Sequence, residues 1–365
     1  MAQINIHRLS GRLAYSQAST FLHFLGTSYL GIPFQPTFIK VLKKGFGLWG
    51  TNYGSSRKGN ISLSVYQEAE SFFAKWVGVE DCVTVSSGFL AAQAIVHWTA
   101  SKNRTVFKVN GDHPALWFEG KIVSQMNSQK NISVDSSLLI RQINSQKGES
   151  CIIMGTSVNP LTGFIYDYSW VRELKKLVIL VVDDSHGFGV LGFGGKGVIK
   201  SIPYNPMVNV IIISSLGKAL GIPGGIILGN AEIVDEIRSS PLFLSSSPVS
   251  PAFLYAFLNC QEIYSTGREK LFENLGTLKN LLPKEIIVSG LHPVISIPLN
   301  LDNRNTHVES LNNYLIRKGI LISSFPYPTV EDVPVTRIVI NACHKLNDLK
   351  KLALSIDKWI LEQNT

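Results

Sequence analysis

The chain has 365 residues, of which 45% are hydrophobic and only 16% are charged, and this excludes an intrinsically disordered protein. The length is enough for about two domains. The 34 basic and 26 acidic residues give a net charge of +8, but no basic stripe with interleaved aromatics is present, so a phosphate-bearing small molecule is favoured over a nucleic acid.

Cysteine spacing and hydropathy exclude two further classes of protein. Cys82, Cys151, Cys260 and Cys343 are far apart in the chain, which argues against a zinc site and against a disulfide scaffold. The amino terminus lacks the apolar core of a signal peptide, and no apolar run is long enough to span a bilayer. We therefore expect reduced core thiols, no metal site, no membrane span and a cytoplasmic location.

The first fifty residues are rich in glycine, aromatic residues and proline, and we expect an arm that packs on the body or on a partner subunit. Short β-branched apolar runs then alternate with longer helix-like segments, which predicts an α/β fold with a mostly parallel sheet. The runs are residues 82–85, 105–109, 151–154, 177–182, 208–213 and 225–228. Glycine, serine, asparagine or aspartate follows each of them, at the sheet edge where parallel strands carry ligand-binding residues.

A helical stretch from about residue 250 to residue 282 follows and ends before Pro283. Beyond it we expect a smaller domain with these elements: strand 294–299, helix 308–318, strand 320–325, strand 336–341 and helix 346–361. The predicted organisation is an arm over residues 1–50, a large domain over residues 51–265 and a small C-terminal domain over residues 266–365.

Lys218 lies in a run of serines and glycines between two apolar stretches, and it follows the acidic pair Asp183–Asp184 in the chain. A lysine amine forms a Schiff base with the aldehyde of pyridoxal phosphate, and a carboxylate keeps the pyridine nitrogen protonated. A lone lysine is more often a surface residue. The small residues around Lys218 leave room for a bulky ring, and we therefore interpret it as the cofactor lysine.

The run 181–189 ends an apolar strand with two acids and a histidine. An acid in this position is often only a turn former. His186 and the glycine-rich tail after it favour a functional site, in which Asp183 lies beneath the cofactor ring and His186 reaches the phenolic oxygen.

Two segments have the character of phosphate sites. In the run 85–93 a strand passes through Ser87, Gly88 and Phe89 into a helix, and the amides at a helix start bind phosphate. An ordinary capped helix is the alternative interpretation. Ser215, three residues before Lys218, is placed to bond the same phosphate.

Three further residues are candidates for contacts with the cofactor or the substrate, and each also has a purely structural interpretation. His113 follows a strand and would stack on a planar ring, or it is a loop residue. Asn159, in the turn 157–163, would bond the phenolic oxygen of the cofactor, or it only forms the turn. Arg337 stands in a β-branched strand, where arginine is either an edge-strand solubiliser or a fork for a carboxylate; we favour the fork.

These motifs, in this order, resemble the α-oxoamine synthases, pyridoxal-phosphate enzymes of the aspartate-aminotransferase fold (fold type I). The resemblance covers nearly the whole chain. It rests on residues 28–31, 65–70, 87–89, 113, 183–186, 218, 328–330 and 337–344.

The resemblance implies a role for each candidate. Lys218 would be the Schiff-base lysine and proton carrier, Asp183 the partner of the ring nitrogen, and His113 the stacking ring. The phosphate would lie on Ser215 and the amides of Gly88 and Phe89. The remaining implied contacts are His186 at the phenolic oxygen, Arg337 at the substrate carboxylate, and Ser246 or Ser247 at the phosphate across the interface of a homodimer.

The implied reaction is a C-acyl transfer in which an amino acid, with L-alanine expected, condenses with an acyl thioester of coenzyme A or of an acyl carrier protein. Residues 159–163 depart from the family, because Asn-Pro-Leu-Thr-Gly replaces a Ser-Met-Asp-Gly run and is closer to an aminotransferase loop. The amino-terminal segment is also shorter than usual. An aminotransferase, a family member that uses glycine or serine, and a non-catalytic cofactor-binding regulator therefore stay open as alternatives.

Overall fold

The structure is a computed structural model that describes residues 4–102, 104–109, 114–116, 122–125, 136–146, 148, 150–286, 288, 290–297, 310–326, 331–332 and 334–363. The chain divides into two compact units. The large unit contains residues 36–159 and 165–261, and the small unit contains residues 1–35, 160–164 and 262–365.

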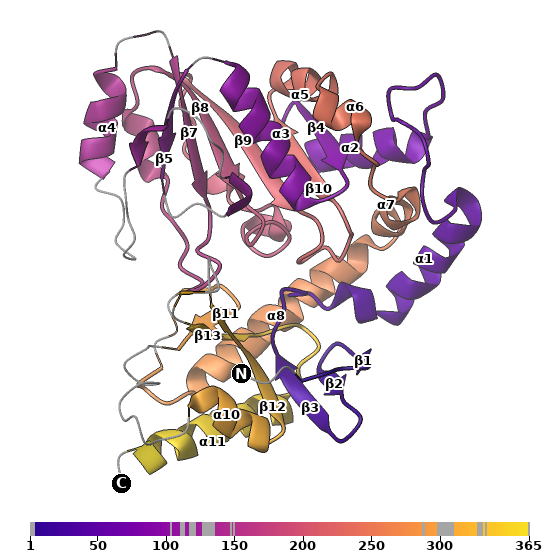
Figure 1. The fold of residues 1–365 in the computed structure, drawn as a ribbon, viewed down its shortest axis with the longest axis vertical. Coiled ribbons are helices and arrows are strands. Elements are labelled where there is room, and N and C mark those ends of the chain that lie inside the picture. Colours follow the sequence, from indigo (N-terminus) through magenta and orange to yellow (C-terminus); the bar gives the residue numbers. More distant parts are fainter. Residues whose placement is uncertain are drawn as a thin grey trace. The chain divides into compact units, whose positions relative to one another are not determined.

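A seven-stranded sheet forms the centre of the large unit (Figure 1). Its strands from edge to edge are β4 (Asp81–Val85), β10 (Gly225–Gly229), β9 (Val208–Ser215), β8 (Leu177–Asp183), β7 (Ser150–Thr156), β5 (Thr105–Lys108) and β6 (Ile122–Gln125). β10 runs antiparallel to β4 and β9, whereas the pairs from β9 to β6 are parallel. The six predicted strands of this sheet are confirmed, and β6 was not predicted.

Helices cover both faces of this sheet, as the alternation of side chains along β4 shows. Val83 and Val85 join an apolar cluster with α3 (Gly88–Ser101) and α5 (Ala231–Arg238). On the opposite face Thr84 contacts Glu70 of α2 (Ser64–Val77), and α2 packs on α7 (Pro251–Leu258) by stacking Phe73 on Phe257 with ring centroids 4.5 Å apart. The strands are therefore buried on both faces, which explains their continuous apolar runs.

The other helices of the large unit are short or peripheral. They are α1 (Pro36–Trp49), α4 (Ser136–Asn144), α6 (Pro241–Ser245) and the 3-10 turns η2 (Pro114–Leu116), η3 (Ser169–Glu173), η4 (Phe193–Gly195) and η5 (Ile199–Ser201). Gly45 lets α1 pack closely on α7, because a Cβ at this position would lie 2.8 Å from the carbonyl oxygen of Ala252.

The small unit contains a second sheet, of six strands. Their order is β1 (Arg8–Leu9), β2 (Leu13–Tyr15), β3 (Thr20–Phe24), β12 (Ile320–Pro326), β13 (Pro334–Val339) and β11 (Val294–Ser296). β3 pairs with β12 in parallel, and the other pairs are antiparallel. The strands predicted after residue 290 are confirmed with shifted ends, and the three amino-terminal strands were missed.

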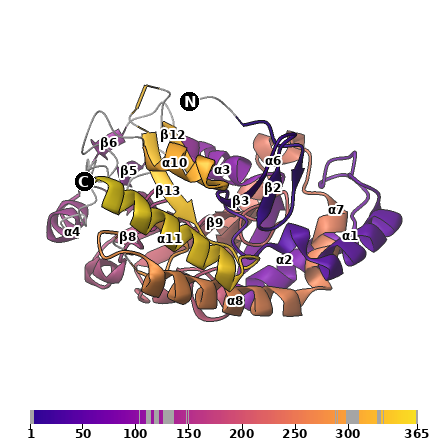
Figure 2. The same ribbon diagram turned by 90° about the horizontal axis from the view of Figure 1, so that it is seen from below.

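Helices α8 (Gln261–Leu281), α10 (Leu311–Arg317) and α11 (Leu346–Gln363) and the turn η1 (Ile32–Phe34) complete the small unit, and α10 and α11 lie side by side in both views (Figure 2). Buried Asn274 of α8 donates to the carbonyl oxygens of Asn341 and His344 at 3.1 and 3.0 Å. Burial lowers the pKa of His344 to about 4, so this imidazole is neutral at pH 7.

Two features differ from the sequence-based expectation. The single helix expected over residues 250–282 is two helices, because the Asn259 side chain bonds the Tyr255 carbonyl oxygen at 2.8 Å and ends α7. The expected arm over residues 1–50 is divided between the units, since residues 1–35 belong with the C-terminal sheet and α1 belongs with the large unit. The boundary expected after residue 265 lies after residue 261.

Within the described ranges, no helix is long and apolar enough to cross a membrane. No group of three or more histidine, cysteine, aspartate or glutamate side chains is placed there to hold a metal ion.

Candidate active site

The ends of three neighbouring parallel strands bring most of the candidate residues of the large unit together. The amide of Ser157, just after β7, donates to the carbonyl oxygen of Asp183 at the end of β8, over 3.0 Å. The amide of Ser215, at the end of β9, donates to Ser185 Oγ at 2.9 Å. The candidate residues therefore lie together at the sheet edge where the sequence analysis expects the site, because the carboxyl ends of parallel strands lie next to one another.

Asp183 is buried, with 7% of its surface exposed, and its side chain is held in place by its own turn. The amide of Ser185 donates to Asp183 Oδ1 at 2.9 Å, a bond that aspartate commonly makes two residues along a turn. His186 lies in the same turn and is equally buried. The turn thus fixes the carboxylate that we expect beneath the ring and brings the imidazole next to it in the chain.

Asp184, to which the sequence analysis gave no role, is fully buried behind Asp183. Its Oδ1 accepts from Ser157 Oγ at 2.6 Å, and its Oδ2 accepts from the amide of Val198 at 3.0 Å. Burial is the largest cause that raises the pKa of this carboxyl, the two hydrogen bonds lower it, the negative charge of Asp183 raises it, and the net pKa is about 7. Asp184 therefore ties the end of β7 to the loop that follows β8.

Two glycines of the tail after His186, Gly187 and Gly197, lie against this carboxylate. A Cβ at Gly187 would lie 2.1 Å from Asp184 Oδ1, and one at Gly197 would lie 1.8 Å from Oδ2. Gly197 also has a φ of +75°, which other residues rarely adopt. The sequence shows an acid followed by spaced glycines. Only the fold shows that Gly187 and Gly197 leave room for the Asp184 side chain.

Lys218 lies in the loop between β9 and β10 and is half-buried. The loop is closed by main-chain bonds from Leu216 to Gly224 and from Ile222 to Leu216, of 2.9 and 3.0 Å. The positive charge of Lys218 lowers the pKa of Asp184, so the ammonium group is within electrostatic reach of the acid pair. The structure thus brings the predicted lysine and the predicted acids to one edge of the sheet.

The start of α3 lies directly against the end of β9. A Cβ at Gly88 would lie 2.6 Å from Ser215 Cβ, and a Cβ at Gly225 would lie 2.2 Å from the carbonyl oxygen of Ser87. Glycine at both positions is therefore what lets the first turn of the helix approach Ser215. Ser87 caps this turn, since its Oγ accepts from the amide of Leu90 at 3.0 Å.

This junction fits a phosphate group. The amides of Gly88 and Phe89 begin a 14-residue helix, where an α-helix leaves its first N–H groups without intrahelical partners and carries partial positive charge. Ser215 supplies a hydroxyl beside them. The predicted phosphate residues Ser87, Gly88, Phe89 and Ser215 are thus together at one capped helix start; their contact with a phosphate stays a prediction.

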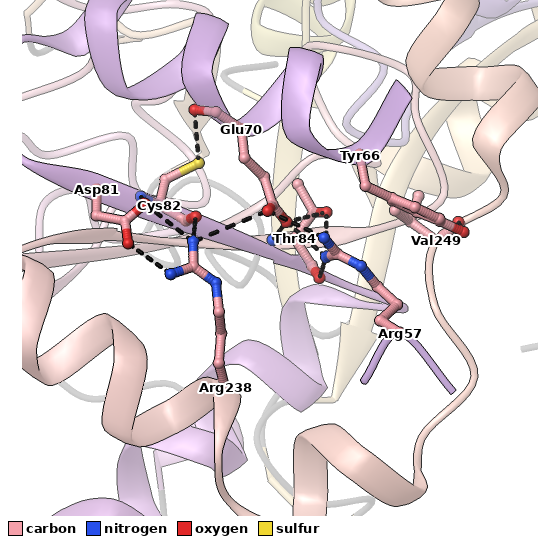
Figure 3. Close-up of polar contacts among 8 residues, drawn as sticks. All are labelled: Arg57, Tyr66, Glu70, Asp81, Cys82, Thr84, Arg238 and Val249. Atoms are coloured by element: carbon pink, nitrogen blue, oxygen red, sulfur yellow. Dashed lines mark hydrogen bonds and ion pairs between the residues drawn. The ribbon is translucent and has the colours of Figure 1, made fainter. Parts of the chain in front are cut away.

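A partly buried ion-pair network supports β4 where it leads into this turn (Figure 3). Arg57 donates to both carboxylate oxygens of Glu70 at 2.5 and 3.0 Å, and Glu70 also accepts from the amide and hydroxyl of Thr84. Arg238 pairs with Asp81 in the same bidentate manner, at 2.5 and 2.9 Å, and lies 3.8 Å from Glu70. The network holds α2 and the segment around Arg57 on the strand that precedes Ser87.

Asn159 is half-buried, and its side-chain amide donates to the Tyr166 hydroxyl at 3.3 Å. Tyr166 is buried, and its amide donates to the carbonyl oxygen of Ser157, so this hydroxyl is anchored to the end of β7. Burial raises the pKa of Tyr166, whereas the bond from Asn159 lowers it. The predicted contact of Asn159 with the cofactor stays a prediction.

Arg337 belongs to the small unit, and its strand β13 lies between β12 and β11. The interpretation as an edge-strand solubiliser is therefore wrong. The side chain is 8% exposed, its guanidinium carbon lies 5.2 Å from the centre of the Phe325 ring, and Nη1 donates to the carbonyl oxygen of Pro160. The segment 160–164 thus packs with the small unit and holds this arginine; its contact with a carboxylate stays a prediction.

For three candidate residues, no described contact links the side chain to the strand ends of the large sheet. His113 lies outside the described residues, as do residues 328–330 of the motif near the C-terminus. Ser246 and Ser247 follow α6, where Ser246 Oγ donates to the carbonyl oxygen of Phe243 at 3.2 Å and Ser247 is exposed. Their predicted part at a subunit interface stays a prediction.

With this geometry in place, comparisons with known proteins give a consistent result. A family model described as aminotransferase class I and II matches residues 36–356. An 8-amino-7-oxononanoate synthase of Buchnera aphidicola subsp. Baizongia pistaciae is 26% identical over 368 residues, which cover 98% of this chain and 93% of the relative.

Two solved structures share the fold. A serine palmitoyltransferase from S. paucimobilis with bound pyridoxal phosphate matches with a TM-score of 0.82 at 16% identity, over 99% of this chain and 93% of that chain. An 8-amino-7-oxononanoate synthase from Francisella tularensis matches with a TM-score of 0.70 at 22% identity, over 94% and 99%. The predicted fold class, the resemblance to α-oxoamine synthases and the use of pyridoxal phosphate by an acyltransferase-type enzyme are confirmed.

Proposed function

Since the chain belongs to the aminotransferase class I and II family, we propose that it is an α-oxoamine synthase that joins an amino acid to an acyl thioester with loss of carbon dioxide. One observation carries this proposal. Asp183, the turn with His186, Lys218 and the junction of α3 with Ser215 converge at the carboxyl ends of β8, β9 and β4.

The residues of the large unit fit pyridoxal phosphate. Ser215 and the amides of Gly88 and Phe89 would hold its phosphate beside the cap formed by Ser87, and Asp183 would hold its pyridine nitrogen. His186 and Asn159 would bond its phenolic oxygen, and His113 would stack on the ring. When bound through Lys218, the cofactor supplies an electron sink for the negative charge left at the α-carbon of the substrate.

The residues of this chain supply the proton transfers and the orientation. The amine of Lys218 takes the proton from the α-carbon of the amino acid. The α-carbon then bonds to the acyl carbon while the thiol leaves, the carboxylate departs as carbon dioxide, and Lys218 returns the proton. Asp183 would pair with the ring nitrogen of the bound cofactor. The products are an α-amino ketone, carbon dioxide and the free thiol.

Arg337 is the proposed anchor for the substrate carboxylate, because a planar guanidinium matches a carboxylate through two parallel hydrogen bonds. The segment 160–164 that packs on it would keep it oriented. For the substrates we propose L-alanine as the amino acid and an acyl-coenzyme A or acyl carrier protein as the donor, as in 8-amino-7-oxononanoate synthase of biotin biosynthesis. The relatives of this name support that choice.

We further propose that the enzyme is a homodimer in which Ser246 or Ser247 reaches the phosphate of the partner subunit. A mostly apolar groove of about 920 Å³ supports this, since it runs from Leu90 and Trp98 of α3 to Leu242 and Ser246 beside α6. A groove of this kind beside a phosphate-binding helix suits a subunit interface. Sedimentation velocity of the purified protein tests it, and a monomer at micromolar concentration would contradict it.

The reaction is tested by measuring thiol and carbon dioxide release with a panel of amino acids and acyl-coenzyme A donors. We expect both products in equal amounts with alanine, and neither with the Lys218→Ala variant. The cofactor-bound protein should show a visible absorption band that this variant lacks. The proposal fails if no amino acid and donor pair releases both products.

An aminotransferase is the second candidate, because residues 159–163 read Asn-Pro-Leu-Thr-Gly. This candidate predicts amino transfer to a 2-oxo acid without thiol release. Turnover with 2-oxo acids alone would establish it in place of the synthase. Synthase activity with glycine or serine in place of alanine would keep the reaction and change only the substrate.

A further inference from the structure

The outer face of α11 in the small unit combines lysines with large exposed leucines. At 3.6 residues per turn, three leucines and three lysines fall within an arc of about 140° on this face, which they share with Asn347 and Asp357. These leucines and lysines are Leu346, Lys350, Lys351, Leu354, Lys358 and Leu361. The opposite face is buried in the core through residues such as Leu352 and Trp359.

The leucines of this face are unusual for a solvated helix. Leu346, Leu354 and Leu361 are 50%, 61% and 59% exposed, whereas single exposed leucines elsewhere need no explanation. Here three of them recur along one helix face between basic residues. A row of exposed apolar side chains on an otherwise polar helix marks an interaction surface.

A cleft of about 400 Å³ between α10 and α11 continues this face. Its charged lining consists of lysines, namely Lys318, Lys350, Lys351 and Lys358, with Tyr314 and Leu354 beside them. Lys318 Nζ lies 5.0 Å from the centre of the Tyr314 ring. Four ammonium groups around one depression attract negative charge.

The nearby acids leave this positive character in place. Asp348 faces the other way and pairs with Arg12 at 3.1 Å, and Glu362 accepts from the Tyr314 hydroxyl at 3.4 Å. Asp357 is exposed on the outer face of α11 but does not line the cleft. Around the cleft itself the lysines therefore dominate.

The spacing of these groups fits a protein better than a small anion or a membrane. Lys350 and Lys358 are separated by about 12 Å along the helix axis, more than one phosphate spans. Lysines alternate with the leucines, and Trp359 is buried, so the face lacks the continuous apolar stripe and exposed aromatics of a membrane-binding helix. The cleft is concave and basic, and leucine side chains are exposed beside it. Such a surface is complementary to an acidic helix that exposes apolar side chains.

We propose that the outer face of α11 and its cleft with α10 form the docking surface for an acidic carrier protein that delivers the acyl thioester. The identity of this partner rests on the proposed function, whereas the surface itself does not. Charge attraction would speed and orient the encounter, and Leu354 and Leu361 would contact apolar side chains of the partner. Because the contacts are lysines on flexible stems, binding is transient and weakens with salt.

The test compares the same acyl group on an acidic acyl carrier protein and on coenzyme A, with the cofactor-loaded enzyme. In the Lys350→Glu/Lys358→Glu variant we expect KM for the carrier-borne substrate to rise by roughly tenfold or more, with KM for the coenzyme A thioester and kcat unchanged. The matched control is Lys279→Glu/Lys284→Glu, which has the same change in charge on the same unit and should leave both KM values unchanged.

Binding of the labelled carrier protein, followed by fluorescence anisotropy, separates the two proposals. If neither donor is turned over but the carrier binds and the α11 variant abolishes binding, the docking surface stands and the proposed reaction fails. An equal rise in both KM values, an equal effect of the control variant, or carrier binding that the α11 variant leaves intact would overturn the docking surface. Lysine-dependent binding to anionic phospholipid vesicles without carrier binding would replace it with a membrane surface.

Discussion

The large unit contains two buried acidic centres that are built in opposite ways. Glu70, beside β4, accepts two N–H groups of Arg57 and lies 3.8 Å from Arg238, so its charge is matched by cations. Asp184, after β8, accepts from a hydroxyl and a main-chain amide, and burial raises its pKa to about 7. The carboxylate of Glu70 is balanced by arginines, whereas the carboxyl of Asp184 has neutral hydrogen-bond donors and holds its proton up to about pH 7.

The two centres indicate which part of this chain needs fixed segments and which part needs negative charge. A buried carboxylate with arginine partners fixes the segments that carry those partners, and it has no capacity for another cation. A carboxylate with neutral donors, next to a second acid, favours a positive group nearby. At the end of β8 that group would be a protonated pyridine ring, which is consistent with the proposed cofactor.

The largest effect should come from the charge at the sheet edge. Asp183→Asn keeps an acceptor for the Ser185 amide but removes the negative charge opposite the ring. We expect kcat/KM for carbon dioxide release to fall roughly a thousandfold, equivalent to about 4 kcal/mol. The melting temperature should change little. A variant with more than a tenth of the original activity would show that Asp183 has no electrostatic part in the reaction.

Glu70→Gln tests the centre in which arginines balance a buried carboxylate. It leaves the half-buried Arg57 guanidinium without its counter-charge, so we expect the free energy of unfolding to fall by about 2 kcal/mol. Urea denaturation measures this change, and kcat per folded molecule should be retained. The control is Lys270→Ala, which breaks an exposed pair with Glu273 and should cost less than about 0.5 kcal/mol. Loss of kcat at unchanged stability would place Glu70 in the catalytic machinery.

Asp184→Asn should change how stability depends on pH. The pKa of Asp184 is raised in the folded state, so the folded protein binds the extra proton, and the stabilisation is complete below the ordinary value of 3.8 and lost as pH rises to about 7. Asparagine stays neutral throughout. Relative to the parent, the variant should gain about 2 kcal/mol between pH 5 and pH 7. Denaturation of the cofactor-free proteins at both pH values measures this, and a pH-independent difference would contradict it.

Ser157→Ala has the smallest expected effect. It removes one hydrogen bond of 2.6 Å to Asp184 Oδ1, and we expect a loss of about 1 kcal/mol of stability at pH 8. Since this bond lowers the pKa of Asp184, the variant should raise that pKa further and move the pH dependence upwards. Ser157→Thr, which keeps the hydroxyl, is the matched control. An unchanged pH profile in the alanine variant would show that the bond is not maintained in solution.

The comparison also shows how far the sequence predicts the candidate site. Lys218, Asp183 and Ser215 were predicted from their positions after apolar strands, because the carboxyl ends of parallel strands often carry ligand-binding residues. Asp184 and Ser157 were not given roles, since a second acid and a serine in a turn are common in sequences. Their function depends on which strands are neighbours, and that is decided by sheet order.

The sequence by itself determined the α/β class, six of the seven strands of the large sheet and the motifs that predict pyridoxal phosphate, because apolar periodicity and turn residues are local properties. Only the tertiary structure decided that residues 1–35 complete the C-terminal sheet, that β13 is an interior strand carrying Arg337, and that Gly187 and Gly197 surround Asp184. Each of these depends on contacts between segments far apart in the chain. Such contacts are set by packing and burial, to which local patterns contribute little.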